Sequence, residues 1–241
     1  DAQKIAFRLR PSTTATERLA LLDNLKTVLI KYQDQIAQAI AEDFGHRSHH
    51  ETKFAEILTS IENIKYYSKN LRNWMQPDKR HINPTHLPAK AWVQYQPLGV
   101  VGIITPWNYP LLLAISPLIC ALAAGNRAMI KMSKNTQKTG AIVKKALTEA
   151  FNEDQVAVIT GGGIVSDAFS RLPFNQITFT GSTNVGRTVM AAAAENLTPV
   201  LLELGGKSPA IIHPSVSMKD AAEKLAFGKG WNAGQTCVAP D

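Results

Sequence analysis

The side chain with the most evident potential for chemistry is that of Cys237, in the segment WNAGQTCVAP of this 241-residue chain. It follows a predicted helix and lies in a polar loop with Gly234, a setting that suits a reactive thiolate. A cysteine is also often a small buried residue, and the local sequence leaves both interpretations open. The other cysteine, Cys120, lies in an apolar predicted helix, where we expect it to be buried and inert.

Two polar residues at the ends of apolar runs could assist such a nucleophile. Asn108 follows the run Val100–Ile104 in ITPWNYP. Its side-chain amide could donate to an oxyanion, or it could cap the helix that Pro110 introduces. Glu203 ends the apolar run VLLE, where it could be a general base beside a cleft or half of a buried salt bridge.

A glycine-containing turn in FTGSTNVGRTVM could bind an anion. Gly181, Ser182 and Gly186 lie between a predicted strand and a predicted helix. Backbone N–H groups and the positive end of a helix dipole attract a pyrophosphate at such a turn. The spacing of the glycines is not the dinucleotide fingerprint, so a plain tight turn explains the segment equally well.

The elements that must position these residues begin with helices. Residues 14–17 read Thr-Ala-Thr-Glu, which fits a capping box. Two apolar stripes with helical spacing follow, and the second, from Phe54 to Trp74, ends before Pro77. The proline-containing residues 79–97 predict an extended arm with a strand near Trp92.

Beyond residue 98, short apolar runs alternate with predicted helices. The predicted strands are Val100–Ile104, Ala128–Lys131, Val156–Ile159, Gln176–Phe179 and Val200–Glu203. This alternation predicts an α/β fold with a doubly wound parallel sheet, and ligands bind such sheets at the carboxyl ends of the strands. Residues 209–212 predict a further strand, and Met218–Trp231 a further helix.

Composition excludes several classes of function. The net charge of +7 permits an anionic ligand, but no basic run is interleaved with aromatic residues, so we expect no nucleic-acid binding. The apolar stretch 110–125 is too short to span a membrane. With two cysteines and no visible signal peptide, we expect a cytoplasmic protein. The histidines of residues 46–50 lack a third ligand, so no metal site is expected.

The segments TPWNYP, FTGSTNVG, LELGGKSP and GQTC, in this order, resemble the NAD(P)-dependent aldehyde dehydrogenase superfamily. The resemblance runs through the whole chain and is strongest to the coniferyl-aldehyde dehydrogenase branch. It implies a Rossmann-like cofactor domain and the oxidation of an aldehyde. Trp107 and Tyr109 are compatible with an aromatic substrate.

The resemblance implies catalytic roles for three residues. Cys237 would attack the aldehyde carbonyl, while Asn108 and the backbone N–H of Cys237 would hold the oxyanion. Glu203 would activate the water that hydrolyses the thioester. Relatives that transfer the acyl group to coenzyme A commonly lack this glutamate, so its presence implies a free acid as product.

The resemblance also implies a site for NAD or NADP. Its expected residues are Ile104, Trp107, Lys131, Gly181, Ser182 and Gly186. Lys131 would bind the adenosine ribose, and Gly181 and Ser182 would meet the pyrophosphate. One departure is Lys134, which stands where the family commonly has a glutamate that repels a 2′-phosphate; we therefore hypothesise that NADP is accepted.

The resemblance further implies that family members are much longer than this chain. Residues 1–78 would be the helical part of the cofactor domain, 79–97 part of an oligomerisation arm, 98–205 the dinucleotide-binding domain and 206–241 the start of the catalytic domain. The longer protein would be a homodimer or homotetramer, and this part would be inactive alone. A catalytically silent nucleotide-binding or structural protein is the alternative.

Overall fold

The core of the fold is a parallel five-stranded sheet. A computed structural model describes all residues 1–241. The strands run in the order β5-β4-β3-β6-β7. Their bounds are Val100–Ile104 (β3), Arg127–Lys131 (β4), Val156–Ile159 (β5), Gln176–Gly181 (β6) and Val200–Leu204 (β7). All the strands predicted between residues 100 and 203 are confirmed, and β6 extends into the glycine turn because Gly181 pairs with Leu204.

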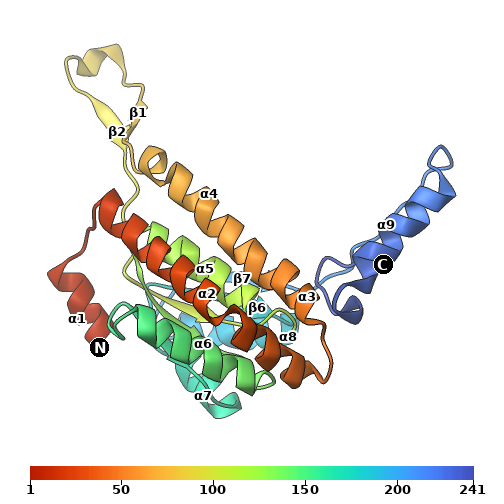
Figure 1. The fold of residues 1–241 in the computed structure, drawn as a ribbon. Coiled ribbons are helices and arrows are strands. Elements are labelled where there is room, and N and C mark those ends of the chain that lie inside the picture. Colours follow the sequence, from red (N-terminus) through yellow and green to blue (C-terminus); the bar gives the residue numbers. More distant parts are fainter.

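Helices cover both faces of the sheet, which confirms the doubly wound α/β architecture (Figure 1). One face carries α2 (Ala15–Phe44), α4 (Thr59–Trp74), α5 (Leu112–Ala123) and α6 (Gln137–Ala150), whose apolar side chains form the larger core. The other face carries α7 (Gly163–Ser170) and α8 (Thr183–Ala194). A short helix not predicted from the sequence, α1 (Ala2–Leu9), is attached to the sheet by the Gln3 amide, which donates to the carbonyls of Ala128 and Glu153.

Local sequence explains the start of α2. The Thr14 hydroxyl accepts from the Glu17 N–H at 3.3 Å, and the Glu17 carboxylate accepts from the Thr14 N–H at 2.8 Å. This is the predicted capping box, and it satisfies donors that a helix start otherwise leaves unpaired.

The second predicted apolar stripe is only partly confirmed. Ile57 and Ile64 are buried, but Phe54 and Trp74 are 58% and 40% exposed. The reason is a change in helical period: α3 (His49–Thr52) continues into a π-helical turn, η1 (Lys53–Leu58), before α4 begins. A π turn contains an extra residue, so it rotates Phe54 away from the buried face.

Two parts of the chain project from this body at opposite ends (Figure 1). One is an antiparallel hairpin of β1 (Asp78–Arg80) and β2 (Ala91–Val93), with the 3-10 turn η2 (Pro84–His86) between them. The other is α9 (Met218–Gly230), followed by the turn η3 (Trp231–Gly234). None of the helices combines the length and apolar character that crossing a bilayer requires.

The strand predicted at residues 209–212 is wrong. This segment has no regular secondary structure, and its pairing is confined to two backbone hydrogen bonds with Asp241, whose carbonyl accepts from Ala210 and whose N–H donates to Ser208. A strand needs a neighbouring strand to continue the ladder, and this segment has none.

Candidate active site

A large cavity with a volume of about 1320 Å³ includes the carboxyl ends of the strands and continues beside α5 toward their amino ends, where Leu98 and Gln176 line it. It is lined by every predicted site residue except Gly186: Ile104, Trp107, Asn108, Lys131, Lys134, Gly181, Ser182, Glu203 and Cys237. The predicted residues therefore converge on one hollow, although they come from segments spread over more than half of the chain. The roles assigned to them remain predictions.

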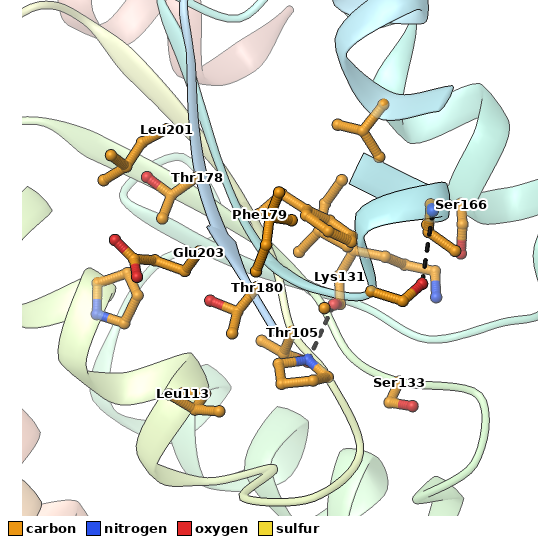
Figure 2. Close-up of a pocket in the computed structure, with 18 of the residues that line it drawn as sticks. Thr105, Leu113, Lys131, Ser133, Ser166, Thr178, Phe179, Thr180, Leu201 and Glu203 are labelled. Atoms are coloured by element: carbon orange, nitrogen blue, oxygen red, sulfur yellow. Dashed lines mark hydrogen bonds between the residues drawn. The ribbon is translucent and has the colours of Figure 1, made fainter. Parts of the chain in front are cut away.

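Strand register divides these residues between the two faces of the sheet. Ile104 is the partner of both Lys131 and Phe179, so these three side chains share the face covered by α7 and α8. Thr180 is the partner of Glu203, and both lie on the opposite face, toward α5. Figure 2 shows Glu203 and Lys131 on different sides of Phe179. The cavity thus wraps around the edge of the sheet and joins the two groups.

Lys131 is held rigidly at the end of β4. Its side chain is buried, and Nζ donates to the carbonyls of Met132 and Gly161, each at 2.8 Å. Desolvation lowers the pKa of this ammonium group. Lys134, three residues further on, is exposed and forms no ion pair, so its charge faces the cavity without a carboxylate to offset it.

The glycine turn between β6 and α8 has two separate functions in the fold. Ser182 caps α8, since its hydroxyl accepts from the Val185 N–H at 3.4 Å. Gly186 does not line the cavity: a Cβ there would lie 2.8 Å from a methyl carbon of Leu204. Its lack of a side chain allows α8 to approach β7, which is a packing role rather than a direct contact with a ligand.

Asn108 does not cap the following helix, so that alternative is wrong. Helix α5 begins at Leu112, and its first N–H groups, those of Leu111 and Leu112, donate instead to Glu56 Oε2 at 2.8 and 2.9 Å. The Asn108 amide is turned the other way: Nδ2 donates to the Gln235 carbonyl at 3.0 Å. An amide nitrogen carries two hydrogens, so one donor remains for another acceptor.

The loop that carries Cys237 is attached to the loop of Asn108 by several hydrogen bonds. Asn232 Nδ2 donates to the Asn108 carbonyl at 2.9 Å, and the Tyr109 hydroxyl lies 2.7 Å from Thr236 Oγ1. Cys237 itself is exposed and lines the cavity. The expected nucleophile and the expected oxyanion donor therefore belong to one hydrogen-bonded unit, and Cys237 is not a buried structural cysteine.

Two further predictions about acidic and thiol groups need correction. Glu203 is exposed and forms no ion pair, so the alternative of a buried salt bridge is wrong. Cys120 was expected to be buried, but it is exposed and lines the cavity. The apolar helix α5 turns this side chain away from the core, and a hydrogen bond with Cys120 Sγ at 3.0 Å raises the pKa of Tyr67 to about 12.

The sequence interpretation missed a buried ion pair beside the site. Arg47 and Glu56 have side chains that are 3% and 0% exposed, with NH1 and Oε1 2.9 Å apart. Burial raises the pKa of Glu56 to about 7, while Arg47 and the N–H groups of Leu111 and Leu112 act in the opposite direction. The only local signal for this pair in the sequence is the charged residue four positions before Glu51, with which Arg47 also pairs at 3.7 Å.

Comparison with known proteins agrees with this geometry. The model of the Aldehyde dehydrogenase family matches residues 1–241. A probable coniferyl aldehyde dehydrogenase of Pseudomonas aeruginosa is 56% identical over 239 residues, which are 99% of this chain and 50% of that protein. The coniferyl aldehyde dehydrogenase of a Pseudomonas species is 42% identical over 224 residues, covering 93% of this chain and 46% of that protein. The chain belongs to the aldehyde dehydrogenase family.

Solved structures give the same result. A substrate-bound AldH of Staphylococcus aureus superposes on 100% of this chain and 52% of its own, with a TM-score of 0.96 and 38% identity. A Mycobacterium tuberculosis aldehyde dehydrogenase complexed with NAD+ covers 99% of this chain and 49% of its own, with a TM-score of 0.87 and 32% identity. The chain spans about half the length of the relatives it matches.

Proposed function

We propose that this chain forms the cofactor-binding part and the nucleophile loop of a hydrolytic, NAD(P)-dependent aldehyde dehydrogenase. The observation that carries the proposal is the hydrogen-bonded unit of the Asn108 and Cys237 loops, which opens into the same cavity as Glu203. A soft nucleophile, an amide donor and a carboxylate base are the groups that oxidation of an aldehyde to an acid requires.

In the proposed mechanism, the Cys237 thiolate adds to the aldehyde carbon. The free hydrogen of Asn108 Nδ2 and the Cys237 N–H then hold the oxyanion that forms on the former carbonyl oxygen. A bound nicotinamide would supply the hydride acceptor for this adduct, and Cys237 would then carry the acyl group as a thioester. Glu203 takes a proton from water, the water oxygen attacks the thioester, and the acid leaves as the thiol is restored.

The cavity suits a dinucleotide at its α8 end. Ser182 and the N-terminus of α8 provide backbone donors and a favourable dipole for a pyrophosphate. Lys131 is fixed between two carbonyls at the cavity wall, where its ammonium group would meet ribose hydroxyls. The volume of about 1320 Å³ leaves room for both a cofactor and a substrate.

We propose that NADP is accepted in addition to NAD, because Lys134 is a free cation in the predicted ribose region. Replacing Lys134 with glutamate should lower the preference for NADP over NAD about tenfold or more, since a favourable charge contact becomes a repulsive one. Kinetics with both cofactors test this. A cofactor preference that Lys134→Glu leaves unchanged would contradict the assignment.

We propose an aromatic aldehyde of the coniferyl type as substrate. The support is the similarity to proteins named coniferyl aldehyde dehydrogenases, together with Trp107, which lines the cavity beside Asn108. Tyr109 is buried and contacts the Cys237 loop through Thr236, so it would act on the substrate only indirectly. A panel of aromatic and aliphatic aldehydes, followed by the absorbance of reduced nicotinamide, tests the class. Equal kcat/KM values for both groups would contradict an aromatic preference.

Activity is best measured on the complete gene product that contains this chain. Cys237→Ser should abolish turnover, and Cys120→Ser is the matched control because both thiols line the cavity. Dehydrogenase activity that survives Cys237→Ser would refute the nucleophile assignment. Cofactor binding with no turnover of any aldehyde would favour a silent nucleotide-binding protein.

We propose the domain boundaries 1–78, 79–97, 98–205 and 206–241, with residues 79–97 as an oligomerisation arm of a homodimer or homotetramer. The hairpin in this range projects from the body and leaves strand edges unpaired (Figure 1). Light scattering of the gene product with and without an arm deletion tests the assignment. We also propose a cytoplasmic location, where a free thiol stays reduced.

A further inference from the structure

The buried ion pair of Arg47 and Glu56 lies directly behind the Asn108 loop. Glu56 belongs to the π-helical turn η1. Its Oε2 accepts hydrogen bonds from the backbone N–H groups of Leu111 and Leu112, where α5 begins. Arg47 NH1 donates to the Asn108 carbonyl at 3.0 Å. The pair therefore holds the backbone of residues 108–112 from both sides: a cation on the carbonyl and an anion on the amides.

The same pair reaches the loop of the nucleophile. The Asn108 carbonyl accepts from Asn232 as well as from Arg47. The backbone N–H of Asn232 donates to Glu51 Oε1 at 2.7 Å, and Glu51 also pairs with Arg47. Through Glu51, the Arg47 guanidinium thus connects the Asn108 carbonyl to the turn that precedes Cys237, and its carbon atom lies 4.8 Å from the centre of the Tyr109 ring.

The turn that precedes Cys237 needs external support. Asn232 and Ala233 have φ values of 49° and 53°, in the left-handed region that costs free energy for residues other than glycine. Such a turn persists where surrounding contacts over-determine it. The contacts of Asn232 with the Asn108 carbonyl and with Glu51 supply that support, and Arg47 contacts both of these acceptors.

Stability alone does not account for this pair. Replacing a buried ion pair with apolar residues of similar volume is often neutral or stabilising, so buried charges are weak evidence for a contribution to folding. Arg47 also leaves Nε and NH2 without a hydrogen-bond partner, so the fold does not use the full hydrogen-bonding capacity of this guanidinium. Its single well-formed backbone contact is the one to Asn108.

We propose that Arg47 is a positioning residue for addition to the Cys237 thiolate: with Glu56 as its anchor, it fixes the Asn108 backbone so that the side-chain amide faces the oxyanion. This inference rests on the proposed function of Asn108 and Cys237. Arg47 touches neither substrate nor nucleophile and acts through the Asn108 carbonyl. A small displacement of a catalytic donor is sufficient to lower a rate severely.

The test compares two reactions of the same thiol in a Cys120→Ser background. Acylation by p-nitrophenyl acetate passes through an oxyanion and reports the Asn108 donor, whereas alkylation by iodoacetamide does not. Arg47→Met should slow acylation about tenfold or more and leave alkylation within about twofold. Arg47→Lys, which keeps a cationic donor, should recover part of the acylation rate.

Two further variants separate positioning from stability. Arg18→Met is the matched control, because Arg18 is also buried and donates to a carbonyl, that of Ala123 at the other end of α5. It should lower the unfolding temperature but not the ratio of acylation to alkylation. The double variant Arg47→Met/Glu56→Gln removes both charges and should recover stability, yet acylation should stay slow.

The results distinguish failure of this inference from failure of the proposed function. If Asn108→Ala slows acylation but Arg47→Met behaves like Arg18→Met, Arg47 is not a positioning residue. Recovery of acylation together with stability in the double variant would lead to the same conclusion. If Asn108→Ala has no effect on acylation, the oxyanion role of Asn108 is wrong, and the inference about Arg47 falls with it.

Discussion

The unfolding free energy of Glu56→Gln, measured relative to that of the wild type, should increase as the pH rises from 5 to 8.5. The Glu56 carboxyl group is fully buried, and burial raises its pKa from 4.5 to about 7 against the opposing effect of Arg47. Because the folded state holds this proton more tightly than the unfolded state, the stability contribution of Glu56 is complete below pH 4.5. It is lost as the pH rises through about 7.

The two pKa values set the size of the effect. The interval from 4.5 to about 7 corresponds to about 3 kcal/mol of unfolding free energy, of which about 2–3 kcal/mol falls between pH 5 and pH 8.5. Glutamine is nearly isosteric and keeps an oxygen that can accept from Leu111 and Leu112, but it does not titrate. The difference between variant and wild type therefore isolates this one group, since all other titrations cancel.

The assay is urea unfolding of both proteins across the pH range. The unfolding free energy of Glu56→Gln minus that of the wild type should grow by about 2–3 kcal/mol toward pH 8.5. Glu42→Gln is the control with the opposite sign, because hydrogen bonding to Lys138 lowers the pKa of the Glu42 carboxyl group. A difference for Glu56→Gln that is flat with pH, or that shrinks as the pH rises, would refute the reasoning.

Two other substitutions test the packing and capping arguments. Gly102→Ala places a Cβ 2.7 Å from the Phe174 ring within the central strand, so overpacking should cost about 1–3 kcal/mol and lower the unfolding temperature; an unchanged temperature would show that the ring can move aside. Thr14→Ala removes the capping box of α2 and should lower the free energy of unfolding in urea by about 1 kcal/mol. Thr16→Ala, two residues further on in the first turn of the same helix, should lower it less. Equal effects of the two threonine substitutions would contradict the capping assignment.

Where the sequence prediction succeeded, the determining interactions are local. The capping box from Thr14 to Glu17 spans four residues, and the strands of the sheet are each four to six residues long. Such patterns depend on periodicity and on neighbouring hydrogen bonds, which can be read along the chain. The ordered motifs around Asn108, Gly181, Glu203 and Cys237 were sufficient to indicate the family.

Where the prediction failed, the outcome depends on distant partners. Asn108 could have been a helix cap, but Glu56, 55 residues from Leu111, already occupies the amides at the start of α5. Cys120 is on an apolar helix, yet the face that it occupies is turned toward the cavity. The π turn at residues 53–58 displaced Phe54 from a stripe that regular helical spacing would have buried.

The sequence by itself therefore determined the strand and helix pattern, the family and the residues that could do chemistry. Only the tertiary structure decided how they act on one another: the Asn108 amide meets the Gln235 carbonyl across 127 residues, and Arg47 reaches the Asn108 carbonyl across 61. Burial is also a property of the folded molecule, and it separates the exposed Glu203 from the enclosed Glu56. The physical reason is that desolvation and hydrogen bonding depend on which groups surround a side chain in space, and residue order does not specify this directly.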